Sequence, residues 1–287
     1  MAGAWANQII QGILLGGLYA MFAIGLSLSV GIMRFVNIAH GDLIVLVSFL
    51  LLTLTTRLGV PLLVATAIVV PVAFVGGYLL QRLLLQRVLG QGVLSIVLVT
   101  FGLSVIIQNA LQGIYGADTR LIQGGGIETE TIQLAGGINI GMLPLAIFVF
   151  AVALVFALDL LLYRTRLGAR IRAVSDDVAS ANLVGLRSAH IYAVAMGIVG
   201  VTVALSAGFM SVWTNFDPTS GPSRLLVAFE AVVLGGLGSL WGTLAGGIIV
   251  GIAQSLGAQV DAGWQLLAGH LVFLAVFLIR PQGLFPK

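Results

Sequence analysis

Residues that could do chemistry are few in this chain, and we find no catalytic set among them. The chain has no cysteine, no spacing of His, Asp and Glu suggests a metal site, and nothing resembles a nucleophile with its base. A phosphate-binding P-loop needs a lysine after its glycines, and the only lysine is Lys287. The sequence therefore predicts no catalytic residue, no metal and no ATP hydrolysis by that route.

Polar residues between apolar segments are the next candidates. The stretch MRFVNIAHGD places Arg34, Asn37, His40 and Asp42 between two apolar runs. Charged groups near hydrocarbon are costly and usually mark a substrate path or a gate. For Asp42 we favour a helix N-cap, whose carboxylate would accept bonds from the free N–H groups of the next helix. We interpret Asn37 and His40 as part of an ordered loop or gate.

Two further polar groups lie within apolar runs. Glu230 is the only acid well inside the late run LLVAFEAVVLGG, and three roles are open: a proton-coupling carboxylate, a partner for an arginine such as Arg224, or a residue at a polar boundary. Gln108 and Asn109 lie near the end of an earlier run, where hydrogen bonding between helices is the commoner use. We keep Glu230, Gln108 and Asn109 as candidates for a translocation path.

Glycines interrupt the apolar run of residues 225–256 near its middle, at Gly235, Gly236 and Gly238. A helix can stop and turn at such glycines, and a broken helix is tolerated at membrane depth only where protein covers it or where it lines a cavity. This pattern predicts a re-entrant or broken segment on the transport path. Close packing of helices through small residues is an equally good explanation.

The elements that hold these residues must be membrane helices. The chain has 287 residues, of which 59% are hydrophobic and 8% charged, and its mean hydropathy is +1.13. Its apolar runs do not alternate as the strands of a β-barrel would. We therefore predict an all-α polytopic membrane protein, with residues 1–287 forming one transmembrane domain. Its hydrophobic segments number about eight, at least one of them broken or re-entrant, and lie near residues 6–31, 42–56, 60–80, 91–114, 141–163, 189–214, 225–256 and 264–279.

Charge predicts which segments face which side. The basic residues lie mostly in short inter-helix segments, which indicates topology signals rather than a nucleic-acid surface. Five arginines fall within residues 164–188, so the positive-inside rule predicts that this segment is cytoplasmic. Counting spans then places the loop 115–140, whose residue types suit short strands, outside, and the N-terminus outside as well. Arg280 and Lys287 come out inside only if the segment 225–256 turns back on itself.

The segment 164–188 also contains a helix pattern. Ser175 is a plausible N-cap, Asp176 and Asp177 would occupy the first turn, and Gly185 can end the helix. Such a helix of about ten residues is too apolar for a solvated turn and too small to anchor itself. A loop that only joins two helices needs few residues. We therefore expect it to dock a cytoplasmic partner.

The stretch RAVSDDVASANLVGL resembles the cytoplasmic coupling loop of ATP-binding-cassette (ABC) importer permeases of the branched-chain amino-acid class. MRFVNIAHGD, FEAVVLGGLGSLWGTLAGG and RPQGLF resemble other hallmarks of that family, in the expected order along nearly the whole chain. The compact size and short N-terminus are similar to the LivH-type subunit rather than to its larger LivM-type partner. The resemblance implies a coupling site that transmits ATP-driven closure, with the residues Arg170, Arg172, Ala173, Ser175, Asp176, Asp177, Ala181, Gly185 and Leu186.

The resemblance also implies partners and a location. These are a second permease subunit or a second copy, two cytoplasmic ATPase subunits that bind ATP and Mg²⁺, and a periplasmic solute-binding protein, all at the bacterial inner membrane. The solute would be a branched-chain or other hydrophobic amino acid, or a related small solute such as urea or an amide. Two other functions remain open from the residues alone. They are an ion-coupled secondary transporter, which Glu230 beside the glycine break would favour, and a passive channel for a small solute.

Overall fold

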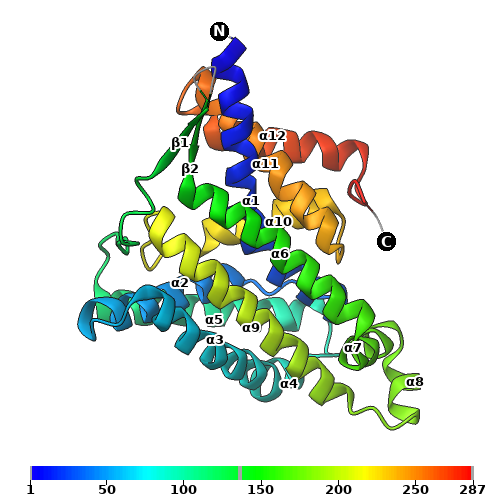
Figure 1. The fold of residues 1–287 in the computed structure, drawn as a ribbon. Coiled ribbons are helices and arrows are strands. Elements are labelled where there is room, and N and C mark those ends of the chain that lie inside the picture. The colour runs from blue at the N-terminus through cyan, green and yellow to red at the C-terminus, as the bar shows by residue number, and fades with distance from the viewer. Residues whose placement is uncertain (1, 135–137, 286–287) are drawn as a thin grey trace.

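The computed structural model describes residues 2–134 and 138–285, and helices dominate it (Figure 1). Two helices continue into π-helical turns, η1 (Thr53–Arg57) after α2 and η2 (Leu80–Leu85) after α3. One antiparallel pair of strands, β1 (Thr131–Leu134) and β2 (Ile138–Gly141), lies between α5 and α6. The helices are α1 (Ala2–Met33), α2 (His40–Leu52), α3 (Leu62–Leu79), α4 (Gln86–Val88), α5 (Val93–Tyr115), α6 (Met142–Arg164), α7 (Arg166–Asp176), α8 (Val178–Leu183), α9 (Ser188–Trp213), α10 (Gly221–Gly235), α11 (Leu240–Val260) and α12 (Trp264–Ile279).

Within the described residues, seven helices are long and apolar enough to cross a membrane. They begin at Trp5, His40, Leu62, Val93, Met142, Ser188 and Leu240, and α12 is a shorter apolar helix of 16 residues. Such lengths satisfy the hydrocarbon thickness of roughly 30 Å at 1.5 Å per residue. The predicted fold class, an all-α polytopic membrane protein, is confirmed.

Helix α1 forms the centre of the bundle and runs antiparallel to α11. The hydroxyl of Thr243 donates to that of Ser27 over 2.8 Å, and near the other end Ser255 donates to the carbonyl of Gln8, also over 2.8 Å. A Cβ atom on Gly16 would lie 2.4 Å from the Cα of Ile248, so only glycine permits this approach of the two backbones. Small residues thus bring membrane helices together where no hydrophobic effect between helices drives them.

The two ends of the bundle differ in what covers them (Figure 1). The strands lie beside the start of α1, where Gln11 donates to the carbonyl of Asn139 and Asn7 accepts from its backbone N–H. We call this the β-hairpin end. The opposite end carries α7 and α8, and Ser175 of α7 donates to the carbonyl of Gly31 in the last turn of α1. We call it the α7 end. The predicted strands in the loop 115–140 are confirmed, although residues 135–137 lie outside the described part of that loop.

The segment predicted near residues 225–256 is two helices, α10 and α11, joined by residues 236–239. Gly236 and Gly238 have φ angles of 99° and 80°, which favour glycine, and the hydroxyl of Ser239 caps α11 by accepting from Gly242 N–H over 3.2 Å. The backbones of Gly235 and Gly242 touch, as do those of Ala231 and Gly246, so the two helices form an antiparallel hairpin. The predicted break is confirmed.

The depth of the break differs from what we expected. The turn lies against Gly31, at the α7 end, and the backbone N–H of Leu284 from the C-terminal tail donates to Leu234 there over 2.8 Å. The glycines therefore mark the end of the bundle and not its middle.

Helices α2 and α10 are the ones that begin deep inside the bundle. The ring of His40, the first residue of α2, hydrogen-bonds the carbonyl of Phe22 over 2.9 Å, and the Arg224 guanidinium of α10 lies over the ring of Phe22. Phe22 is about 16 Å along the helix axis from Met33, roughly half the thickness of the hydrocarbon layer. The chain therefore returns to mid-depth in residues 34–39 before α2 and in residues 214–220 before α10.

Candidate functional site

Buried polar side chains gather where α2 and α10 begin. Asn37, His40 and Asp42 are each at most 1% exposed. The side-chain oxygen of Asn37 accepts from the backbone N–H of Ala39 over 3.0 Å, which fixes the turn into α2. Since His40 meets a carbonyl through Nε2, that nitrogen carries the proton. Its Nδ1 has no hydrogen-bond partner among the described residues. Asn37 thus lies in the ordered turn before α2, and His40 begins that helix at mid-depth.

Asp42 does not cap α2, so that prediction is wrong. Ala39 holds the N-cap position without a side-chain bond, and the Asp42 carboxylate accepts from Nε2 of Gln108 over 2.9 Å. This bond ties α5 to α2, and Gln108 also donates to Ser104 of its own helix over 3.1 Å. A Cβ atom on Gly221 would lie 2.0 Å from Asp42, so α10 begins directly on this carboxylate. The pairing of Asp42, Gln108 and Gly221 has no local signal in the sequence.

Asn109 lies beside this cluster but is not part of it. Its amide donates to the carbonyl of Val105 in its own helix over 2.8 Å, and its side chain is exposed. Exposed polar side chains on a membrane helix do not face lipid without cost. This face of α5 is therefore a candidate surface of a polar path or of a partner.

Glu230 pairs with His270, not with Arg224. One oxygen of the Glu230 carboxylate accepts from or donates to Nδ1 of the His270 ring on α12. Arg224 instead donates to the carbonyl of Asn215 over 2.8 Å. Near this pair the hydroxyl of Tyr19 donates to Gln254 over 2.5 Å. One polar bond therefore joins α10 to α12, and another joins α1 to α11. Tyr19 and Gln254 are residues that the sequence reasoning missed.

The predicted coupling segment is two short helices, and Ser175 and Asp176 take other places than expected. Both lie in the last turn of α7, because Ile171 and Val174 bury an apolar face that extends this helix to Asp176. Asp177 is the N-cap of α8, accepting from the backbone N–H groups of Ala179 and Ser180 over 2.9 and 3.3 Å. The bond donated by the Ser180 hydroxyl, together with these two, holds the pKa of Asp177 below its ordinary value.

Gly185 ends α8 as predicted, with a φ of +86°. Leu186 N–H donates to the carbonyl of Ala181 over 3.0 Å, which closes the turn. Ala181 is buried, whereas Leu183 and Val184 are 88% and 78% exposed. The helix therefore presents two apolar side chains away from the rest of the chain.

The two arginines of the predicted coupling set, Arg170 and Arg172, differ in their surroundings on α7. Arg172 lies over the ring of Tyr163 and donates to the carbonyl of Leu162, which fastens α7 to the end of α6. Arg170 and Ala173 lie on α7, and Arg170 is exposed. Thr165 caps α7 by accepting from Gly168 N–H over 3.0 Å. The predicted residues of the segment thus lie in one compact unit at the α7 end.

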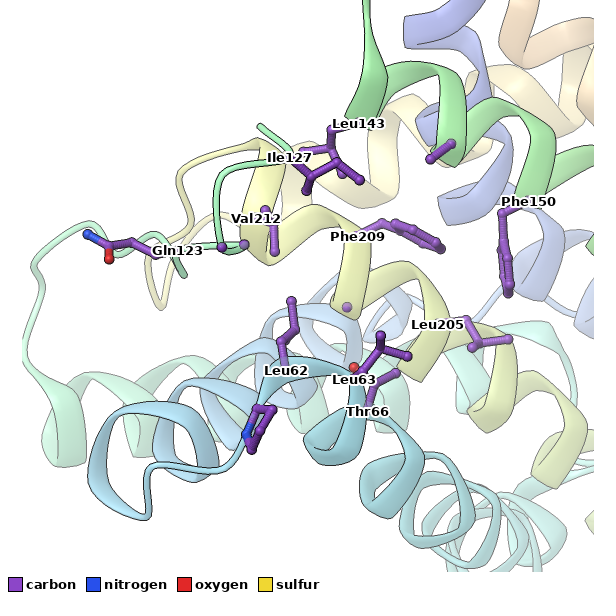
Figure 2. Close-up of a pocket in the computed structure, with 15 residues that line it drawn as sticks. Leu62, Leu63, Thr66, Gln123, Ile127, Leu143, Phe150, Leu205, Phe209 and Val212 are labelled. Atoms are coloured by element: carbon purple, nitrogen blue, oxygen red, sulfur yellow. The ribbon is translucent and has the colours of Figure 1, made fainter. Parts of the chain in front are cut away.

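A separate cavity of about 660 Å³ opens near the β-hairpin end, between α3, α6, α9 and residues 123–127 (Figure 2). Figure 2 shows Leu62, Phe150 and Phe209 around it, while the amide of Gln123 points away. Among the described residues that line it, none has an acidic or basic side chain and none is a path candidate. An amino acid carries both charges, and no side chain of opposite charge lines this cavity for either of them.

Comparisons with known proteins give a consistent result. Residues 8–280 match the family model described as branched-chain amino acid transport system / permease component. The chain is 31% identical to the high-affinity branched-chain amino acid transport system permease protein BraD of Pseudomonas aeruginosa, with 99% of this chain and 96% of that protein aligned. It is 27% identical to LivH of Escherichia coli over 98% of this chain and 95% of that protein, and 25% identical to a probable LivH of Methanocaldococcus jannaschii over 97% and 92%. No solved structure matches the chain.

Proposed function

Since this chain belongs to the branched-chain amino acid permease family of ABC importers, we propose that it carries branched-chain amino acids through a path beside Asn37, His40, Asp42 and Gln108. The chain is a multi-pass permease subunit of the inner membrane. The names of its relatives favour branched-chain amino acids over urea or amides as the solute. The buried polar cluster supplies the hydrogen-bonding groups that a polar solute needs at mid-depth.

The exposed pair Leu183 and Val184 is the observation that supports a docking role for α8. A short helix held by its own N-cap and by a glycine terminus is ordered before it binds. Exposed apolar side chains on such a helix suit a groove in a partner protein. In our proposal, that partner is a separate ATPase subunit, which binds ATP and Mg²⁺.

In this proposal, the two ends of the bundle face opposite sides of the membrane. The α7 end, with the arginines of residues 164–188, faces the cytoplasm, and the loop 115–140 faces the periplasm and receives a solute-binding protein. A second permease subunit, or a second copy of this chain, completes the path next to the exposed face of α5 that contains Asn109.

The test is to substitute Leu183 with Asp in the assembled importer. We expect ATPase subunits to dissociate from the purified complex and solute uptake to fall at least tenfold, because a charge would be buried in an apolar groove. Val93→Asp is the matched control, since Val93 is 76% exposed and is the first residue of α5, where an acid suits the helix dipole. Normal uptake and bound ATPases in the Leu183→Asp complex would refute the docking role.

A further inference from the structure

Arg34 has an unusual backbone conformation. It is the only non-glycine residue with a positive φ within residues 2–134 and 138–285, at +57°. Its backbone N–H donates to the carbonyl of Val30 over 3.0 Å, so it occupies the left-handed position that ends α1. Glycine is the usual residue there, and an ordinary L-residue pays about 1–2 kcal/mol for this conformation. Strain of this kind persists where the surroundings hold the residue in place.

The side chain of Arg34 supplies such a hold. Its guanidinium Nη2 donates to the carbonyl of Ser175 over 3.2 Å, in the last turn of α7. A cation near the C-terminal end of a helix is favourable, because carbonyl groups there carry partial negative charge. The Ser175 hydroxyl in turn donates to the carbonyl of Gly31 over 3.1 Å. Two hydrogen bonds therefore join the last turn of α1 to the last turn of α7.

The backbone of Arg34 leads directly to the buried polar cluster. The left-handed turn reverses the chain, and residues 35–39 then return to mid-depth at His40. Asp42, within the first turn of α2, holds Gln108 and supports Gly221 of α10. The side chain of Arg34 therefore contacts α7, and its backbone turn begins the segment that returns to mid-depth.

We propose that Arg34 is a positioning residue that transmits movement of α7 and α8 to the mid-depth segment of residues 35–42. The guanidinium moves with the end of α7, and the strained backbone passes that movement to the turn that starts the segment. Glycine would suit the backbone at this position, but it would end α1 without making the link to Ser175 that arginine makes. This inference rests on the proposed docking of an ATPase on α8.

The test uses Arg34→Gly and Arg34→Asn in the reconstituted importer with its ATPase subunits. Both replacements tolerate the left-handed conformation, and neither reaches Ser175. We expect solute taken up per ATP hydrolysed to fall at least about fivefold, the lower end of usual coupling effects between sites. A cap-only role for Arg34 predicts a wild-type ratio in both variants, and that result would overturn the proposal.

A second measurement follows the movement itself. Because this chain has no cysteine, Ser223→Cys gives it a single reporter thiol at the exposed start of α10, next to Gly221, which contacts Asp42, and the thiol labelling is counted on this chain alone. We expect ATP to change its rate of thiol labelling when Arg34 is present and to have no effect in the Arg34→Gly background. An equal change in both backgrounds would contradict the proposal even if uptake were lost.

Arg87→Ala is the matched control for loss of one cation. Arg87 is exposed on α4, and it takes no part in the two hydrogen bonds that join α1 to α7. It should keep the wild-type ratio of uptake to ATP hydrolysis, and a loss equal to that of Arg34→Gly would assign the effect to charge alone.

The Leu183 and Arg34 variants distinguish the failure of one proposal from the failure of the other. If Leu183→Asp releases the ATPase subunits while the Arg34 variants keep the wild-type ratio, only the Arg34 inference is refuted. If Leu183→Asp changes nothing, docking of an ATPase on α8 is refuted, and the Arg34 inference that rests on it is refuted as well.

Discussion

Glu230 is a buried acid on a membrane helix, and its carboxylate is hydrogen-bonded to the ring of His270. Glu230→Gln keeps an oxygen that can accept a bond from the His270 ring. Because a permease driven by ATP needs no proton exchange at this pair, we expect this change to alter uptake by less than about twofold. Glu230→Leu removes the acceptor and should lower the free energy of unfolding by about 1–3 kcal/mol. Uptake assays and thermal melts of the purified complex measure these two effects. Loss of uptake in a folded Glu230→Gln complex would instead favour an ion-coupled transporter.

Asp177 should make the order of α8 depend on pH. Its pKa is lowered by the Ser180 bonds and the Ala179 N–H, so its contribution to α8 is complete above the ordinary pKa of aspartate. That contribution is lost as the pH falls through the lowered pKa of the folded state. Asp177→Asn keeps a cap and should remove this dependence, whereas Asp177→Ala should remove the cap at every pH. Exchange protection of the Ala179 and Ser180 amides is the measurement, and equal protection in both variants would contradict the assignment.

Local sequence signals predicted the role of a residue correctly where its backbone decides that role. They failed where contacts with distant residues decide it. Gly185 ends its helix as expected, because a positive φ favours glycine whatever else is near. Ser175 failed as an N-cap because burial of Ile171 and Val174 extends α7 past it. Asp42 failed because its partner, Gln108, lies on a different helix. A single sequence carries no information about such a pair.

The α10–α11 hairpin depends on contact between glycine backbones. A Cβ atom on Gly242 would lie 2.1 Å from the carbonyl oxygen of Gly235, so Gly242→Leu must push the two helices apart. We expect a loss of about 1–3 kcal/mol or more in stability, measured as a lower melting temperature in detergent. Gly102→Leu is the control, because nothing lies within 4 Å of a Cβ atom there and leucine is the better helix former. Equal melting temperatures for the two variants would contradict the close hairpin.

Apolar runs predicted the helices, but not the depth at which two of them begin. Length and hydropathy predicted the long helices that the structure describes, and the glycines predicted the break after Gly235. The return of residues 34–39 and 214–220 to mid-depth is different, because His40 and Gly221 take their depth from contacts with Phe22 and Asp42. Those contacts depend on how α1, α2 and α10 pack, which no local pattern encodes.

The whole molecule has two unlike ends, and the proposed function assigns each to one side of the membrane. A reporter enzyme that is active only in the periplasm, fused at Gly125, should be active, since Gly125 lies in the loop 115–140. The same reporter fused at Gly185 should be inactive, because that residue lies on the α7 end among the arginines. The reverse pattern would invert the topology and remove α8 from the reach of any cytoplasmic ATPase.

Dependence on ATP is the central claim, and one measurement tests it most directly. The complete importer is reconstituted in vesicles with ATPase subunits that bind ATP but cannot hydrolyse it, and uptake of leucine is followed with and without a proton or sodium gradient. Because this chain belongs to an ABC permease family, we predict uptake no greater than in vesicles without the importer, whichever gradient is applied. Accumulation of leucine driven by a gradient through the inactive complex would contradict the account and identify the chain as a secondary transporter.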